Sequence, residues 1–585
     1  MRKLAWIRRC VAAVVLVLFA VSFLQVLPAA SVLYTLERVQ LVPAFLSSVQ
    51  GGAWGWVALG ALLVLVLLLG RVYCSWICPL GMMQDVVNRL RHPKPQARSG
   101  GGIRYTPNHW VIRAAVALLA LGSVPLLGTL LLTWLDPYSL SARFMVGVVN
   151  PAVAWMAETA GVAYQPVDWL RYTPWLLVLL GAMVALPLVM AWLRGRLYCN
   201  TICPVGSVLG LLARLAPLTP RIDARRCGVC GSCLRECKAH AIDLKNRRVD
   251  VTRCVGCYNC ISSCERGAMK LRWHNPFAGP AAAATGEDNV SARGIKAEKA
   301  RLSAGYAGAG RARQSQAADM SRRAFLGLGL TCLASAAVPE LRTEPSGDVS
   351  APGTNVGPAV LPPGAGSLEH LLSVCTGCGL CISACPSHVL RPSFTVLGWR
   401  GLMKPYLDYT VGYCAPDCHT CSQVCPVGAL SPLSLEQKRR TQIGLIAYRQ
   451  SNCRIWKDLT DCALCASKCP TGAITAVKVK RPAVLETQCV GCKAKRCLNA
   501  CPTGSISFVT CADTGRRLAV INYDTCIGCG YCAEACTRYR GIEVREVKAL
   551  EFNPGLCNGC GACEHVCPPR PKAIEVLPRI RQLGL

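Results

Sequence analysis

Acidic residues are scarce in this sequence. Its 585 residues include 32 Asp and Glu against 64 Lys and Arg, which gives a formal net charge of +32. Charged residues make up 16% of the chain and aromatic residues 6%. The sequence has no flavin or nucleotide fingerprint, no C-x-x-C-H haem-attachment motif and no recognisable nucleic-acid-binding motif. These absences argue against a nucleotide-dependent enzyme, a c-type cytochrome and a nucleic-acid-binding protein, and no hydrolytic or group-transfer site is apparent.

Cysteine, by contrast, is abundant. Residues 1–205 are apolar and hold few Cys, whereas most of the 39 Cys lie between positions 227 and 567. They recur as C-x-x-C-x-x-C triplets, which suit a [4Fe–4S] cubane better than internal disulfides or the paired thiolates of a zinc site. A cubane with four thiolates carries a charge of about −2, so about eight of them offset roughly half of the positive excess.

The first 205 residues contain four apolar stretches long enough to cross a bilayer, at about 10–31, 54–72, 110–134 and 174–193. We therefore predict an α-helical membrane domain of four transmembrane helices. Cations gather before the first stretch, after the second and after the fourth, whereas the loops at 32–53 and 135–173 hold few. By the positive-inside rule, both ends of this domain face the cytoplasm.

The second and fourth stretches end in near-copies of one motif, RVYCSWICPLG from Arg71 and RLYCNTICPVG from Arg196, which identifies an internal repeat. In each copy two Cys four residues apart share a helical face, and a Pro then breaks the helix. The duplication favours one four-thiolate metal or redox site on a pseudo-twofold axis. Packed thiols, a thiol–disulfide relay and a transient metal site remain open as alternatives. The residues concerned are Cys74, Cys78, Cys199 and Cys203.

A two-cluster bacterial ferredoxin follows the membrane domain. The fourth Cys of each motif is expected to ligate the cluster that is bound by the first three Cys of the other motif. One predicted ligand set is Cys227, Cys230, Cys233 and Cys264, and the other is Cys254, Cys257, Cys260 and Cys237.

Residues 274–320 are rich in Ala, Gly, Ser, Arg and Gln and are predicted to form a flexible linker. Ser321-Arg322-Arg323-Ala-Phe-Leu then precedes the apolar run 324–338, which contains Ala334-Ser-Ala336. This pattern predicts a twin-arginine export signal inside the chain, either cleaved after Ala336 or kept as an anchor.

Beyond the signal lie six further cluster motifs, which we pair in chain order into three two-cluster modules. The first module comprises Cys375, Cys378, Cys381 and Cys385 with Cys414, Cys418, Cys421 and Cys425. The second comprises Cys453, Cys462, Cys465 and Cys469 with Cys489, Cys492, Cys497 and Cys501. The third comprises Cys526, Cys529, Cys532 and Cys536 with Cys557, Cys560, Cys563 and Cys567. Cys10, Cys332 and Cys511 are left as structural thiols.

The predicted fold is thus an α-helical, duplicated membrane domain followed by several α+β two-cluster ferredoxin modules. The expected domains are a membrane domain at 1–215, a cytoplasmic ferredoxin at 216–273, a linker at 274–320, a signal or anchor helix at 321–340, and a polyferredoxin at 341–585 with about six clusters. The inner membrane is the expected location, with residues 200–320 cytoplasmic and the polyferredoxin periplasmic.

The paired C-x-x-x-C-P motifs and the first ferredoxin resemble the NapH-type membrane quinol-dehydrogenase subunit of periplasmic nitrate reductase systems. A more distant resemblance is to membrane ferredoxins such as the regulator of nitrous oxide reduction. Residues 321–585 resemble the exported NapG/MauM-type ferredoxins, with three modules in place of two. The chain therefore looks like a fusion of the two families.

This resemblance implies electron transfer between the membrane quinone pool and a periplasmic cytochrome or reductase, with quinone as a further cofactor. The sequence marks no quinone site. Two other functions remain open: a maturation factor for copper-oxidase assembly, in which the C-x-x-x-C-P thiols reduce or pass on a metal, and a redox-sensing regulator. Eight clusters in series favour an electron conductor over a sensor, which needs only one.

Overall fold

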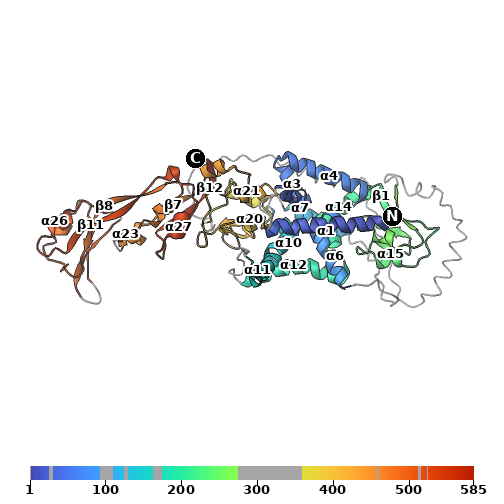
Figure 1. The fold of residues 1–585 in the computed structure, drawn as a ribbon, viewed down its shortest axis with the longest axis horizontal. Coiled ribbons are helices and arrows are strands. Elements are labelled where there is room, and N and C mark those ends of the chain that lie inside the picture. Colours follow the sequence, from blue (N-terminus) through green and yellow to red (C-terminus); the bar gives the residue numbers. More distant parts are fainter. Residues whose placement is uncertain are drawn as a thin grey trace.

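The structure is a computed structural model that describes residues 2–25, 31–91, 110–123, 129–162, 174–273, 359–457, 460–510, 515–523 and 525–584. Figure 1 shows three parts in a row: a small N-terminal ferredoxin at one end, a helical domain in the middle, and a long arm of ferredoxin modules that reaches away from the other end. The two sets of ferredoxin modules therefore lie on opposite sides of the helical domain.

The helical domain is formed by the first 215 residues. Apolar runs build its long helices, and α12 continues through an internal proline, Pro187. A π-helical turn at Met145–Val149 joins α10 to α11. The helices are α1 (Arg2–Leu24), α2 (Ser31–Arg38), α3 (Leu41–Val49), α4 (Ala53–Leu69), α5 (Tyr73–Trp76), α6 (Pro79–Arg91), α7 (Trp110–Gly122), α9 (Leu130–Leu135), α10 (Pro137–Phe144), α11 (Asn150–Thr159), α12 (Pro174–Arg194), α13 (Leu197–Thr201) and α14 (Pro204–Leu212).

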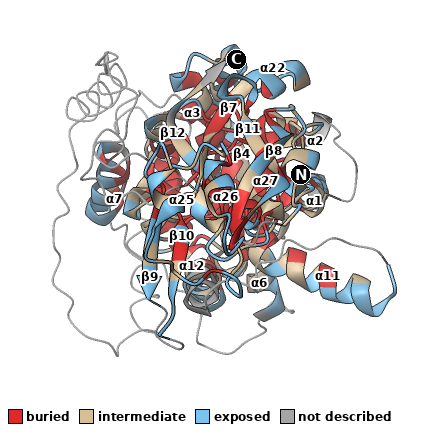
Figure 2. Cartoon of the chain, turned by 90° about the vertical axis from the view of Figure 1, so that its left-hand side faces the viewer, coloured by how far each residue is buried: buried red, intermediate tan, exposed pale blue. Residues whose placement is uncertain are grey.

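Two helical segments of the described chain are long and apolar enough to cross a membrane, Lys3–Leu24 and Pro137–Thr159. The first coincides with a predicted span. The second lies in the stretch predicted to be a loop, and its α11 portion is mostly exposed and projects from the domain in Figure 2. The predicted spans at 54–72 and 174–193 correspond to α4 and α12.

The surface of the helical domain is apolar. Large side chains such as Val17, Trp56, Val64, Leu119 and Trp192 are exposed on α1, α4, α7 and α12. An apolar surface spread over several helices is unfavourable in water and favourable against lipid. Together with the two long apolar helices, it indicates association with a membrane.

The N-terminal ferredoxin has two antiparallel pairs of strands, in which β1 pairs with β4 and β2 with β3. Each cluster motif leads into a single helical turn. The elements are β1 (Leu218–Ile222), α15 (Ser232–Arg235), β2 (Ile242–Asp243), β3 (Arg248–Val249), α16 (Asn259–Ser262) and β4 (Met269–Trp273).

The C-terminal arm contains four more two-stranded sheets. Its elements are α19 (Leu368–Val374), α20 (Leu380–Ser383), β5 (Leu390–Pro392), β6 (Pro405–Leu407), α21 (Thr420–Val424), α22 (Leu435–Arg440), β7 (Thr441–Tyr448), α23 (Arg454–Lys457), α24 (Leu464–Ser467), β8 (Ile474–Val484), α25 (Arg496–Asn499), β9 (Ile506–Thr510), β10 (Arg517–Ile521), α26 (Tyr531–Ala535), β11 (Ile542–Phe552), α27 (Ala562–Val566) and β12 (Ile574–Gly584).

Three of these sheets are nested along the chain. Strand β7 pairs with β12, β8 with β11, and β9 with β10, so each pair encloses the next in sequence. The β8–β11 ribbon is continuous from Ile474 opposite Phe552 to Val484 opposite Ile542. This nesting separates motifs that are neighbours in sequence and brings distant motifs together.

The two halves of the helical domain are held by a reciprocal pair of buried arginines. Arg71 donates a hydrogen bond to the carbonyl of Cys199 at 2.9 Å, and Arg196 donates one to the carbonyl of Cys74 at 2.7 Å. Both arginines are 1% exposed. Because each repeat supplies the arginine that binds the other repeat's motif, the two copies pack about a pseudo-twofold axis.

Gly81 and Gly206 make this close packing possible. A Cβ at Gly81 would lie closer than 3 Å to the Cys74 carbonyl oxygen and to Arg196, and one at Gly206 would lie equally close to the Cys199 carbonyl and Arg71. The carbonyl obstacle belongs to the same repeat as the glycine, and the guanidinium belongs to the other repeat. A methyl group here therefore distorts the turn of its own motif and displaces the arginine that joins the repeats.

We expect Gly81→Ala and Gly206→Ala each to destabilise the helical domain by about 1–3 kcal/mol, the usual cost of overpacking. Thermal unfolding in detergent, followed by tryptophan fluorescence, measures the effect. Gly60→Ala is the matched control, because a Cβ at this position of α4 meets nothing within 4 Å. Melting temperatures for the Gly81 and Gly206 variants as high as that of the control would contradict the packing argument.

Candidate functional site

The N-terminal ferredoxin forms two cysteine cages. Cys264 lies beside Cys227, Cys230 and Cys233, although it closes the second motif in sequence. In the same way Cys237 joins the cage of Cys254, Cys257 and Cys260. The cages adjoin, since Cys233 and Cys260 interact across them. This is the exchange of fourth ligands predicted from the sequence.

The first module of the C-terminal arm has the same exchange. Cys425 lies with Cys375, Cys378 and Cys381, and Cys385 lies with Cys414, Cys418 and Cys421. The cage that contains Cys375 rests directly on the helical domain. Thr129 donates a hydrogen bond to the Cys375 carbonyl at 2.6 Å, and Arg143 donates to the carbonyls of Thr376 and Gly377 at 2.9 and 3.0 Å.

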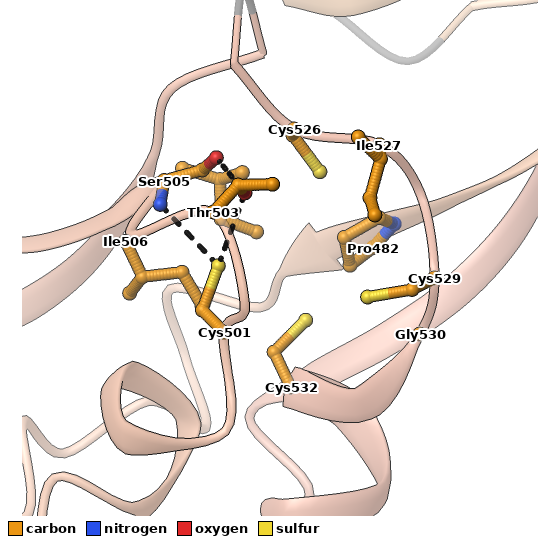
Figure 3. A pocket seen from close by; sticks show the side chains of 11 residues that line it. Pro482, Cys501, Thr503, Ser505, Ile506, Cys526, Ile527, Cys529, Gly530 and Cys532 are labelled. Carbon is orange, nitrogen blue, oxygen red and sulfur yellow. Dashed lines mark hydrogen bonds between the residues drawn. The ribbon is translucent and has the colours of Figure 1, made fainter.

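The remaining four motifs pair differently from the prediction. Cys501 lies with Cys526, Cys529 and Cys532, and Figure 3 shows these four side chains pointing toward one another. Cys567 lies with Cys453, Cys462 and Cys465, while Cys469 lies with Cys557, Cys560 and Cys563. Cys536 then adjoins Cys497 in the cage of Cys489, Cys492 and Cys497.

The pairing in chain order was therefore wrong for these two modules. The inner module combines the motifs that begin at Cys489 and Cys526, and the outer module combines those that begin at Cys453 and Cys557. The physical reason is the β8–β11 ribbon, which inserts the inner module into the outer one and brings the ends of the outer module together.

The described cages are suited to a cluster rather than to one metal ion. In the described residues, no three His, Cys, Asp or Glu side chains are close enough to bind a single ion. Four thiols that converge at a wider spacing match a cubane, whose irons each bind one thiolate. Backbone N–H groups also point at the sulfurs, for example Ala241 to Cys237, Ala519 to Cys489 and Leu430 to Cys425, all at 3.4 Å. Such hydrogen bonds tune the reduction potential of a cluster.

Burial makes these thiols dependent on iron for their ionisation. It raises the pKa of Cys254 and of Cys465 to about 12, and that of Cys237 to about 11. Such thiols are protonated at neutral pH unless a positive charge stabilises the thiolate. Cluster insertion therefore has to displace protons from the cages.

The cages of the arm follow one another toward its tip. Cys414 donates its backbone N–H to the Cys560 carbonyl at 2.9 Å, which joins the first module to the outer module. Between the outer and inner modules, the rings of Trp456 and Tyr523 lie 6.1 Å apart, with the Arg481 guanidinium 4.1 Å from the Trp456 ring centre. Tyr523 packs against the apolar cores of both modules.

The four C-x-x-x-C-P cysteines meet inside the helical domain. Cys74, Cys78, Cys199 and Cys203 are each 3–4% exposed and lie in one cluster of buried side chains. Cys199 and Cys203 from one repeat are close to Cys74 and Cys78 from the other. The Gly206 N–H points at the Cys203 sulfur at 3.3 Å.

This centre adjoins the N-terminal ferredoxin. Arg71 donates to the Thr252 carbonyl at 2.9 Å, and Asn200 donates to the Ala239 carbonyl at 3.1 Å. Thr252 and Ala239 flank the motifs of the cage that contains Cys237 and Cys254. The four thiols therefore lie next to that cage.

On its other side, the same centre is connected toward the cage that contains Cys375. Tyr198, next to Cys199, donates a hydrogen bond to the Leu135 carbonyl at 2.9 Å. Three residues further on, Tyr138 lies next to Cys378. Both tyrosines are 1% exposed. A continuous run of buried groups therefore extends from the four-cysteine centre to the first cage of the arm.

The sequence interpretation missed these supporting residues, although one signal was available. Arg71 and Tyr73 recur as Arg196 and Tyr198 in the repeated motif, outside the cysteines themselves. Nothing in the sequence pattern distinguished Tyr138 or Leu135, because their role depends on the segment 130–144 packing into the buried core of the helical domain.

Of the three cysteines without a cage, Cys10 is exposed on α1. Cys332 and Cys511 lie outside the described residues, as do the predicted linker and the segment with Arg322 and Arg323.

Four family models match the chain. A 4Fe-4S binding domain matches twice, at residues 51–98 and 175–221, which are the two segments with the C-x-x-x-C-P motifs. A 4Fe-4S dicluster domain matches residues 250–389, and a second dicluster domain matches residues 519–576. A further 4Fe-4S binding domain matches residues 417–429. The chain is therefore a protein with multiple 4Fe–4S ferredoxin domains, and its internal repeat is confirmed by the double match.

Several of the curated relatives are named as ferredoxin-type proteins. The chain is 29% identical over 182 residues to the ferredoxin-type protein NapH of Escherichia coli, which covers 30% of this chain and 52% of the relative. It is 28% identical over 184 residues to the methylamine utilization ferredoxin-type protein MauN of Paracoccus denitrificans, covering 30% and 53%. It is 31% identical over 144 residues to MauM of Methylophilus methylotrophus, covering 22% and 62%. The chain thus spans about half the length of the first relatives it matches, and the predicted resemblance to NapH-type and MauM-type ferredoxins is confirmed.

The nested pairing predicts which cysteine is released when one cluster is removed. In the triple variant Cys557→Ser, Cys560→Ser, Cys563→Ser, iron content should fall by about four atoms per chain, because one cubane is lost. Cys469 should then react with an alkylating reagent while Cys536 stays protected, as peptide mass spectrometry will show. As the matched control, Cys526→Ser, Cys529→Ser, Cys532→Ser should expose Cys501 instead. Labelling of Cys536 in the first variant would support pairing in chain order.

Proposed function

We propose that this protein is a membrane-bound electron-transfer protein that conducts electrons through its iron–sulfur clusters from one side of the membrane to the other. The proposal rests on the positions of the ferredoxin modules at the two ends of α1. The first end of this helix contacts α16 of the N-terminal ferredoxin, and its last turns contact α20 beside the cage of Cys375.

The length of α1 sets the separation of those modules. Its 23 residues extend for about 34 Å at a rise of about 1.5 Å per residue, close to a hydrocarbon core of about 30 Å. Ferredoxins that contact the two ends of such a helix belong on opposite membrane faces. Together with the cation distribution, this arrangement supports a cytoplasmic first ferredoxin and a periplasmic arm.

Four transmembrane segments at α1, α4, α7–α9 and α12 agree with the exposed apolar surface of the domain. The four-cysteine centre between them would hold a further iron–sulfur centre, as the double match of a 4Fe-4S binding domain to these segments supports. It would connect the cage of Cys254 with the buried tyrosines that lead toward Cys378.

The quinone pool is the proposed redox partner in the membrane, and a cytochrome or reductase is the proposed partner of the arm. This assignment follows the resemblance of the sequence to NapH-type quinol-dehydrogenase subunits, and no described residue marks a quinone site. The maturation alternative is less favourable, because a metal or disulfide exchanged with another protein has to be reached, and the four thiols are 3–4% exposed.

If the four-cysteine centre carries the electrons, Cys78→Ser and Cys203→Ser should each abolish reduction of the protein by menaquinol. All eight ferredoxin clusters should still assemble, since a missing thiolate opens one site without unfolding distant modules. Iron analysis and EPR after dithionite reduction measure assembly, and stopped-flow absorbance measures quinol-dependent reduction. Cys10→Ser is the control, because Cys10 is exposed and belongs to no cage. Normal quinol-dependent reduction in both variants would indicate that these cysteines are packed thiols without a redox role.

The proposed periplasmic location of the arm can be tested separately. Replacing Arg322 and Arg323 with Lys should leave the arm on the cytoplasmic side, because the twin-arginine pathway requires that pair. A protease added to intact spheroplasts should digest the arm of the unmodified protein and spare that of the variant. An arm that is digested equally in both cases would rule out export through this signal.

A further inference from the structure

The cage at the tip of the arm has an unusual motif. Cys492 and Cys497 are separated by four residues where the regular motif has two, and the intervening segment carries Lys493, Lys495 and Arg496. All three cations are exposed. Lys495 has a left-handed backbone, with φ of 46°, at the start of α25. The insertion therefore forms an exposed, positively charged turn within the motif of this cage.

A second segment adds cations to the same cage. Cys536, which adjoins Cys497, is followed closely by Arg538 and Arg540, and both side chains are exposed. Among the described residues, no carboxylate forms an ion pair with these two arginines or with the three cations of the insertion. Two separate loops thus place five positive charges beside one cluster site, and no carboxylate of the described residues pairs with them.

Apolar side chains are also exposed in the motifs of this inner module. Ile527 is 65% exposed and Tyr531 is 54% exposed, and Val490 and Tyr539 are also exposed. Figure 2, which looks onto the tip, labels both α25 and α26. Figure 1 places α26 at the end of the molecule farthest from the helical domain. A macromolecule can therefore approach this face without contact with the membrane.

We propose that the tip of the arm is the docking surface for an acidic redox protein, which exchanges electrons with the cluster of Cys489, Cys492, Cys497 and Cys536. This inference rests on the proposed function and adds the charge of the partner and the place where it binds. The exposed cations steer an acidic partner in the correct orientation, and the exposed apolar side chains of the same module allow close contact with it. Binding through a small charged interface is weak and short-lived, as repeated electron exchange requires.

The position of the cluster favours a redox protein over a nucleic acid. A nucleic acid needs a continuous cationic track along its backbone, and the described cations here lie beside one cage. A membrane surface is also disfavoured, because the tip is the most distant part of the molecule from the apolar helices.

The test uses the full chain in detergent, reduced with dithionite and freed of excess reductant. Its oxidation is followed by stopped-flow absorbance with two probe proteins: plastocyanin, which is acidic, and mammalian cytochrome c, which is basic. At about 10 mM ionic strength, where charges act over about 30 Å, Lys493→Gln with Lys495→Gln should slow oxidation by plastocyanin about 3-fold to 10-fold. The difference should disappear at about 1 M salt, and oxidation by cytochrome c should not slow.

Lys245→Gln with Arg248→Gln is the matched control, since it removes the same charge from exposed positions of the N-terminal ferredoxin, at the other end of the molecule. It should change the plastocyanin rate less than twofold. Equal slowing in the control, or equal slowing with both probes, would overturn the docking proposal, and so would tight binding of single-stranded DNA at the tip. Because dithionite supplies the electrons, the result is independent of whether menaquinol reduces the chain, so the two proposals fail separately.

Discussion

The helical domain depends on one interaction, in which Arg71 and Arg196 each hydrogen-bond to the cysteine motif of the opposite repeat. A buried guanidinium has five donors and no way to lose its charge, so it is stable only where acceptors converge. Here the acceptors are the carbonyls of Cys199 and Cys74, together with the Thr252 carbonyl for Arg71 and the Asp85 carboxylate for Arg196. One pair of side chains therefore joins the two repeats to each other and to the ferredoxin that follows them.

The repeats are similar in backbone and different in charge. Asp85 binds Arg8 at 3.1 Å, Arg196 at 2.8 Å and Lys238 at 3.2 Å, which fixes α1 and the N-terminal ferredoxin to the first repeat. The equivalent position of the second repeat is Gly210, where the space is filled by Arg113 and the Thr252 carbonyl. Because Gly210 has no side chain, the backbone of the N-terminal ferredoxin can approach the second repeat. The four-cysteine centre is pseudo-symmetric, but the single ferredoxin beside it contacts the two repeats differently.

The ferredoxin modules of the arm are stabilised in a different way from the helical domain. Each two-cluster module is small and has little apolar core of its own, so exchange of the fourth ligand between motifs makes the clusters part of the fold. The nested strand pairs then hold successive modules at fixed positions. In the junction of the outer and inner modules, Trp456, Tyr523 and Arg481 pack against one another and join the two modules.

The cysteine spacing by itself determined the chemistry of this protein, because a cubane needs thiolates at short, regular intervals and few other sites do. It gave all 32 cage cysteines and the exchange of fourth ligands in the first ferredoxin. The duplicated motif likewise predicted that Cys74, Cys78, Cys199 and Cys203 meet. Only the tertiary structure decided that Cys469 joins Cys557 and that Cys501 joins Cys526, since strand pairing between residues as far apart as Ile474 and Phe552 is not encoded in any local interval. The same holds for Tyr198 and Tyr138, whose link depends on a segment predicted as an external loop folding into the helical domain. Local spacing fixes which atoms bind a cluster, whereas the packing of distant segments fixes which clusters are neighbours.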